Sequence, residues 1–245
     1  MRARRSLHVK HFQFKSNPHV SHGGEHTRLA LQQDGHRIWG PVLYRSTYKS
    51  DTDWAEFMRR LQFRTQRFLE ISHPPDLVDA FRLTVLEHES AFEGATTSAI
   101  RAHFKHWTET AVEDDQGPGT RPKDAQRYRY CVQVDEEGLD TVVRKAPGPE
   151  DPYVLNTVGY VRLISKDWKP YDPAMYLSGV KYLEDSAAPI EGCTLDNVGW
   201  MNVPYDNLVK AFRHLRALHD WDYQYRRPPV LWDPSTLSPL RSYRP

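Results

Sequence analysis

Cysteine is scarce in this chain: its 245 residues include only Cys131 and Cys193. A secreted domain held by disulfides needs more, and Cys131 lies in an apolar stretch where a thiol ordinarily serves as small core filler. No run approaches the roughly 18 apolar residues of a membrane span. The basic start MRARR is not followed by the apolar segment of a secretory signal. These absences predict a soluble cytoplasmic protein with reduced thiols and no membrane contact.

An excess of either charge is also lacking, because 33 Lys and Arg residues face 32 Asp and Glu residues. Nucleic-acid binders usually carry a basic surplus on one face, so no nucleic-acid partner is predicted. The chain is 39% hydrophobic and 12% aromatic, which is enough to form a packed core. Its length allows one sizeable domain or two small ones.

The familiar catalytic and nucleotide-binding motifs are missing too. The chain contains no G-x-G-x-x-G, P-loop, G-x-S-x-G, H-E-x-x-H or C-x-x-C pattern. The stretch HGGEH at 22–26 offers two imidazoles and a carboxylate, but its two glycines give no rigid frame and further ligands are lacking. We therefore expect no cofactor and no metal, and predict that residues 1–27 form a mobile polar arm. Within it, HVKHFQF at 8–14 alternates enough to form an edge strand.

Three regular elements are expected in the first half of the chain. Asp34-Gly35 lies between extendable segments and predicts a hairpin. Residues 42–48 alternate as a strand, and the polar run 50–53 then caps an amphipathic helix that ends by Ser72, before His73-Pro74-Pro75. Residues 81–88 predict a strand, and Thr96 or Thr97 caps the next helix.

The second half repeats a strand, an acidic cap and a helix. RYRYCVQVDEEGLDTVV at 127–143 is the clearest case, with Asp135 as cap and Glu136 and Glu137 in the first helical turn. Residues 157–164 form a further strand, and 198–218 repeat the theme with Asp206 as cap. The predicted fold class is α+β: a mainly antiparallel sheet with helices packed on one face, in ferredoxin-like units. One domain spans 28–221, and a Pro- and Arg-rich tail extends over 222–245.

If helices cover only the apolar face of this sheet, its other face carries polar side chains. Strand parity gives the candidate ligand-binding residues Arg45, Arg82, Arg129, Cys131, Gln133, Tyr160 and Arg162. Guanidinium groups bind carboxylates and other anions bidentately, so this face suits an anion. Three interpretations stay open: a face open to solvent, an interface with a protein partner or a second copy, and a cavity for a small anionic ligand.

Several blocks of the sequence resemble a family of filamentous-fungal proteins of uncharacterised function. They are WGPVLYRSTYKSDTDW (39–54), RYRYCVQVDEEGLDTVV (127–143), VGYVRLI (158–164), DNVGWMNV (196–203) and WDYQYRRPP (221–229). The resemblance covers roughly residues 36–230. It implies a cytosolic fungal protein with a single continuous domain, and it implies no activity, cofactor or catalytic residue.

Two functional hypotheses follow from the sequence. The first is a binding or interaction protein that uses the polar face of its sheet. The alternative is a cofactor-independent isomerase, cyclase or hydrolase for an anionic substrate. In that case Arg45 and Arg129 would hold the anion, and Glu87, His88 or Asp135 would move a proton.

Overall fold

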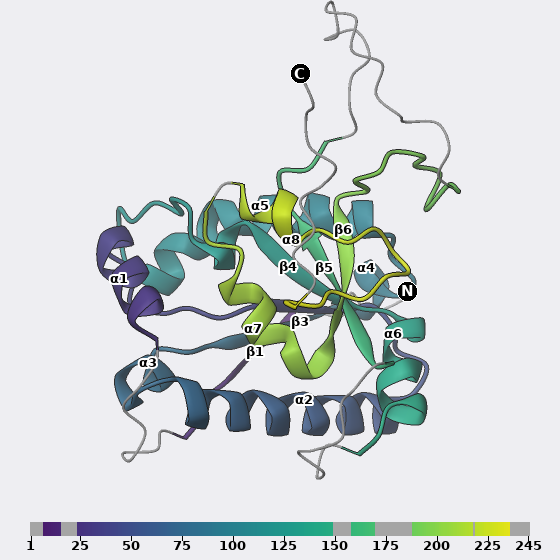
Figure 1. Cartoon of the computed structure of the whole chain (residues 1–245), viewed down its shortest axis with the longest axis horizontal. Coiled ribbons are helices and arrows are strands. Elements are labelled where there is room, and N and C mark those ends of the chain that lie inside the picture. The colour runs from purple at the N-terminus through teal and green to yellow at the C-terminus, as the bar shows by residue number, and fades with distance from the viewer. Residues whose placement is uncertain (1–6, 16–23, 149–157, 170–187, 218, 236–245) are drawn as a thin grey trace, which may run out of the picture.

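A six-stranded sheet forms the centre of the fold (Figure 1). The computed structural model describes residues 7–15, 24–148, 158–169, 188–217 and 219–235. The strands lie in the order β1-β3-β2-β4-β5-β6. Their bounds are β1 His8–Phe12, β2 Val42–Arg45, β3 Leu83–Glu87, β4 Tyr130–Val134, β5 Tyr160–Ser165 and β6 Trp200–Pro204.

The sheet is mixed, which corrects the prediction of a mainly antiparallel one. The three central strands β3, β2 and β4 run parallel. The strand β1 lies antiparallel beside β3, β5 lies antiparallel beside β4, and β6 lies antiparallel beside β5 at the edge of the sheet. Parallel neighbours need long crossover connections. Two long helices provide them, because α2 (Asp51–Ser72) joins β2 to β3 and α5 (Thr97–Gln116) leads from β3 to β4.

Local capping chemistry begins both long helices where the sequence predicts. The Ser50 hydroxyl accepts from the Asp53 amide at 3.1 Å, and the Thr96 hydroxyl accepts from the Ala99 amide at 3.2 Å. The helix α2 ends at Ser72, and α3 (Pro75–Asp79) begins with a proline at a position that needs no amide hydrogen. The short helix α4 (Glu89–Phe92) lies between β3 and α5.

Helices cover both faces of the sheet, so the prediction of helices on one face is wrong. One face carries residues such as Leu43 and Val132, which share a core cluster with Leu61 of α2. The other carries Val42 and Cys131, which pack with Phe104 of α5, behind the strands in Figure 1. The physical reason is the handedness of crossovers: β3 and β4 lie on opposite sides of β2, so two right-handed connections place α2 and α5 on opposite faces.

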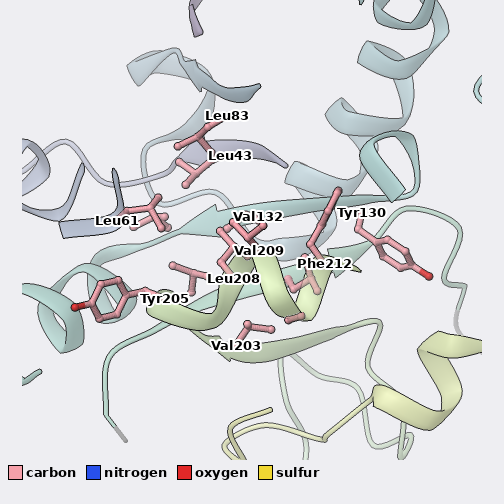
Figure 2. Close-up of a cluster of buried hydrophobic side chains, with 14 of the residues drawn as sticks. Leu43, Leu61, Leu83, Tyr130, Val132, Val203, Tyr205, Leu208, Val209 and Phe212 are labelled. Carbon is pink, nitrogen blue, oxygen red and sulfur yellow. The ribbon is translucent and has the colours of Figure 1, made fainter. Parts of the chain in front are cut away.

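The second half of the chain completes the core. The helix α7 (Leu208–Arg213) packs on the same face as α2, and Figure 2 shows Leu208, Val209 and Phe212 directed into a cluster with strand residues such as Val132 and Val203. It follows a 3₁₀ turn at Tyr205–Asn207, so its N-cap is Asn207 and not the predicted Asp206. The predicted cap at α6 (Glu136–Asp140) is confirmed, since the Asp135 carboxylate accepts from the Gly138 amide at 2.9 Å.

The predicted hairpin at Asp34-Gly35 is instead the end of helix α1 (Glu25–Asp34). Gly35 adopts a left-handed φ of 68°. Its amide donates to the Gln32 carbonyl at 3.2 Å, and the His36 amide donates to the Leu31 carbonyl at 2.9 Å. These two bonds form a Schellman motif, in which glycine avoids the Cβ clash of a left-handed residue. An Asp-Gly pair fits a hairpin turn and a helix C-terminus equally well.

Parts of both predicted terminal segments belong to the fold. Residues 8–12 form the edge strand β1, while residues 1–6 and 16–23 of the predicted arm lie outside the described residues. In the predicted tail, α8 (Asp220–Gln224) precedes Tyr225 and Trp232, whose side chains are buried in the core. Residues 236–245 lie outside the described part. No helix within the described ranges is long and apolar enough to cross a membrane.

Candidate functional site

The seven residues predicted to form a ligand-binding face do not converge. Cys131 and Gln133 do share one face of β4, as their parity predicts, but α4, α5 and the loop at Ala95 cover that face. Both side chains are 0% exposed. Burial raises the pKa of the Cys131 thiol, which keeps it protonated and unreactive. The sheet face that the sequence predicts to carry a polar surface is therefore covered by helices, and its side chains form a second hydrophobic core.

Gln133 acts as a bridge inside this core. Its amide nitrogen donates to the Ser46 hydroxyl at 3.0 Å and to the Ala95 carbonyl at 2.7 Å. These bonds connect β4 to the loop after β2 and to the loop before α5. The Gln133 carbonyl oxygen is buried and has no hydrogen-bond partner among the described residues.

Arg45 ends β2, whereas Arg82 and Arg129 directly precede β3 and β4. Arg45 is on the α2 face, where its guanidinium donates to the Thr47 carbonyl and pairs with Asp51 at 2.5 Å. Arg82 and Arg129 lie at the opposite ends of their strands. Arg45 pairs in register with Val134, so β4 separates Arg129 from it by five residues, about 16 Å at the rise of a strand. The two arginines cannot hold one small anion together.

Tyr160 and Arg162 belong to an ionic network at the carboxyl end of β4. The Arg162 guanidinium contacts Asp135 at 2.7 Å and both Glu137 and Glu191 at 3.3 Å. Burial, together with a hydrogen bond to Glu137, raises the pKa of Tyr160. Doubly wound sheets bind ligands at this end, where crossovers diverge to opposite faces. Here these polar side chains pair with one another, which ties α6 and β5 together.

A sizeable crevice lies at the other end of the parallel strands, between α1, the segment leading into β2, and α7. Its volume is about 680 Å³, within the usual range of small-molecule sites. Residues from sequentially distant parts of the chain line it, including His26, Leu29, Leu31, Asp34, His36, Ile38, Trp39, Phe68, Arg127, Lys210, Arg213, His214, Arg216, Asp220 and Gln224.

Two partly buried interactions fix one wall of the crevice. The Arg216 guanidinium grips the Asp34 carboxylate through two bonds, at 2.5 and 2.9 Å, and so joins the end of α1 to the chain after α7. The buried His36 ring bonds the Arg121 carbonyl through Nε2 at 2.9 Å. A carbonyl only accepts, so Nε2 carries a hydrogen and Nδ1 faces Asp34 at 4.0 Å. These contacts hold the wall in place before any ligand arrives.

Apolar side chains form much of the remaining surface. Leu31 and Ile38 contribute aliphatic surface, and Trp39 and Phe68 contribute aromatic rings. The Trp39 indole N–H donates to the Leu77 carbonyl at 2.8 Å, which fixes the orientation of the ring. A ligand with an apolar body would displace water from this surface.

Two cations in the crevice form no direct ion pair with a carboxylate of the described residues, although Lys210 acts electrostatically on Asp233. Lys210 and Arg213 are three residues apart on α7 and therefore share a face. No ion pair joins either side chain to a described residue, whereas Arg216 pairs with Asp34 and Arg127 pairs with Asp115 at 2.8 Å. Burial lowers the pKa of the Arg213 guanidinium, whose closest aromatic contact is the Phe68 ring at 6.0 Å.

The electrostatics of the crevice are positive. Burial lowers the pKa of His214, and the charges of Arg213 and Lys210 lower it further. A protonated imidazole is disfavoured there because it would add a third positive charge. An anion, by contrast, would be attracted to the same point.

The spacing of the basic residues in the sequence points to this site, although it matches no familiar motif. Basic residues recur at 210, 213 and 216, a three-residue spacing that aligns them along one side of the helix predicted after the Asp206 cap. The sequence gives no reason to place Asp34 beside these basic residues. The Asp-Gly pair favours a hairpin, and 182 residues separate Asp34 from Arg216.

Neither a metal cluster nor a relative identifies the site. Within the ranges that the structure describes, no group of three or more His, Cys, Asp or Glu side chains could hold a metal ion. The HGGEH stretch lies partly outside those ranges, and its Glu25 carboxylate pairs with Arg28 at 2.6 Å. No family model, curated protein or solved structure matches the chain. The chemistry of the crevice therefore rests on its own residues.

Proposed function

We propose that this protein binds a small molecule with an anionic head and an apolar body in the crevice between α1 and α7. The observation that carries the proposal is Arg213, a partly buried guanidinium without an ion-pair partner among the described residues. Leaving a buried charge uncompensated is costly, and a bound anion removes that cost. Lys210 on the same side of α7 adds a second positive charge.

The shape of the site supports a ligand with two distinct ends. The cations come from α7, whereas Leu31, Ile38 and Trp39 supply the apolar wall near α1 and β2. An aliphatic or aromatic carboxylic acid satisfies both parts, since guanidinium binds carboxylate bidentately and the apolar body covers the wall. The volume of about 680 Å³ admits a molecule of drug-like size.

This proposal keeps the small anionic ligand of the sequence hypotheses and moves it away from the sheet face. The cofactor-independent enzyme stays an alternative that the same ligand experiment separates: a binding protein releases its ligand unchanged, and an enzyme releases a product. The fungal family, the cytoplasmic location and the ferredoxin-like units stay predictions of the sequence.

The test is a thermal-shift screen of aliphatic and aromatic carboxylic acids, followed by calorimetric titration of the hits. A ligand at 100 times its dissociation constant adds about 2.7 kcal/mol to the free energy of unfolding. For a chain of this size that corresponds to a rise in Tm of roughly 5–10 °C. The released ligand is then analysed by mass spectrometry for conversion.

Arg213→Met removes the charge and keeps an apolar stem over Phe68. We expect it to weaken binding by at least about tenfold, the usual value of a charged hydrogen bond. Arg67→Met, at an exposed arginine of α2 that pairs with Glu70, is the matched control and leaves the affinity unchanged. Equal affinities of the Arg213→Met variant and the wild type for every hit would overturn the proposal.

A further inference from the structure

A second pocket lies on the α5 side of the sheet. It shares no lining residue with the crevice, and its residue types differ. It has a volume of about 390 Å³ and is formed by α5 and the segment that follows β5. Its lining residues are Ser98, Arg101, Ala102, Lys105, Lys166, Asp167, Trp168 and Lys169. Ser98, Arg101, Ala102 and Lys105 recur at helical spacing, so one side of α5 forms a continuous wall.

Positive charge dominates this pocket. Four of its lining side chains are cationic and one is a carboxylate. The Asp167 carboxylate lies 4.0 Å from the Lys166 ammonium, at the limit of an ion pair, and Lys105 and Lys169 have no ion-pair partner in the described part of the chain. Burial lowers the pKa of Lys166, and the nearby charges of Arg129 and Lys105 act in the same direction. Such a concentration of like charge is unfavourable without a counter-ion.

Arg101 places one of these charges inside the protein. The residue is 9% exposed. Its guanidinium donates to the Ser165 carbonyl at 2.9 Å and to the Gly199 carbonyl at 3.1 Å. Both acceptors are neutral. The Glu191 carboxylate attracts Arg101 electrostatically, but no carboxylate of a described residue forms a direct ion pair with it. The orientation of Arg101 is therefore fixed while its guanidinium has no directly bonded counter-ion, which suits an anion site.

Trp168 makes the pocket rigid. Its ring lies under the Arg101 guanidinium at 4.8 Å, and its indole N–H donates to the Asn197 carbonyl at 3.0 Å. The ring also approaches Gly199 so closely that a Cβ there would lie 2.3 Å from it. The contacts of the aromatic ring with the protein fix its position, and the pocket offers a ligand its charged groups together with the apolar stems that carry them.

We propose that this pocket binds the phosphate groups of a small, multiply charged molecule. Arg101 would supply fixed guanidinium donors at its base, and Lys105, Lys166 and Lys169 would supply ammonium groups around its rim. Four cations against one carboxylate suit more than a single negative charge. The ligand proposed here differs from the ligand of the crevice. The crevice combines its cations with a large apolar wall, whereas this pocket has four cations.

The experiment is calorimetric titration of the full chain with inorganic pyrophosphate at low salt. We expect saturable binding with one equivalent, and weaker binding as sodium chloride is added, because salt screens exposed charges. Lys166→Met keeps the packing of a largely buried stem and weakens binding about tenfold. Lys105→Met changes an exposed residue that the fold does not need, and weakens binding roughly threefold.

Two comparisons make the result decisive. Lys49→Met removes an exposed lysine near α6, whose ammonium lies 3.9 Å from Glu136, and leaves pyrophosphate binding unchanged. A short single-stranded oligonucleotide distinguishes a free phosphate compound from a nucleic-acid backbone. The proposal is overturned if pyrophosphate does not bind at low salt, if Lys105→Met and Lys166→Met leave its affinity unchanged, or if the oligonucleotide binds while pyrophosphate does not.

Discussion

The buried imidazole of His73 makes the stability of this protein depend on pH. His73 follows α2 and is 0% exposed, with its ring 4.9 Å from that of Trp39 and 5.7 Å from that of Phe68. The Ser72 hydroxyl donates to the Phe68 carbonyl, so the His73 Nδ1–H donates to the Ser72 oxygen at 2.9 Å. Its Nε2 is therefore an acceptor, buried without a partner among the described residues.

Protonating this ring inside the protein would bury a charge. Burial, with a further contribution from the charge of Arg213, lowers the pKa of His73 from 6.5 to about 3. The unfolded chain thus binds this proton first as the pH falls. The contribution of the neutral His73 ring to the free energy of unfolding is complete above pH 6.5, and it is lost progressively as the pH falls towards 3. One pKa unit corresponds to about 1.4 kcal/mol, so the loss at pH 5 is about 2 kcal/mol.

The assay is thermal unfolding between pH 7.5 and pH 5 for the wild type and for His73→Phe. Phenylalanine fits between the two aromatic rings and cannot titrate. About 2 kcal/mol corresponds to a fall in Tm of roughly 4–8 °C for a chain of this size. We expect the wild type to lose that much more than the variant across this range.

Burial also lowers the pKa values of His11, His103 and His214, and these residues are present in both the wild type and the variant. The difference between the two slopes of Tm against pH therefore reports His73 alone. His106→Gln, at an exposed ring that is 84% accessible, is the control for the loss of a surface histidine, against which the slope of His73→Phe is compared. Parallel pH profiles for the wild type and His73→Phe would refute the argument.

Two further predictions concern buried groups. Arg127→Met leaves the Asp115 carboxylate, the Gly40 carbonyl and the Thr84 hydroxyl without a buried guanidinium that bonds them at 2.8, 3.0 and 2.7 Å. We expect urea denaturation to show a loss of about 3–5 kcal/mol, and a loss below about 1 kcal/mol would contradict it. Burial raises the pKa of the Cys131 thiol, so a thiol reagent should label only the partly exposed Cys193 in the native protein and both cysteines in denaturant; native labelling of Cys131 would contradict its place in the core.

Most local elements could be predicted from the sequence because their causes are local. Ser50, Thr96 and Asp135 each cap a helix within three residues, and the strands keep their alternation over short windows. The Asp34-Gly35 pair was misread because its turn chemistry serves two structures. Asp206 was misassigned for a similar reason, since a 3₁₀ turn moves the start of α7 to the next residue.

Sequence patterns alone locate both long helices and most of the strands, show which residues share a face of β4, and show that the chain carries no familiar catalytic motif. The covering of both faces of the sheet follows from the arrangement of the strands in space, because it depends on which side of β2 receives β3 and which receives β4. That choice buries Cys131 and Gln133. The tertiary structure also brings Asp34 to Arg216 and leaves Arg213 without an ion-pair partner among the described residues. The sequence does not show this pairing of charges, because it depends on contacts between distant segments.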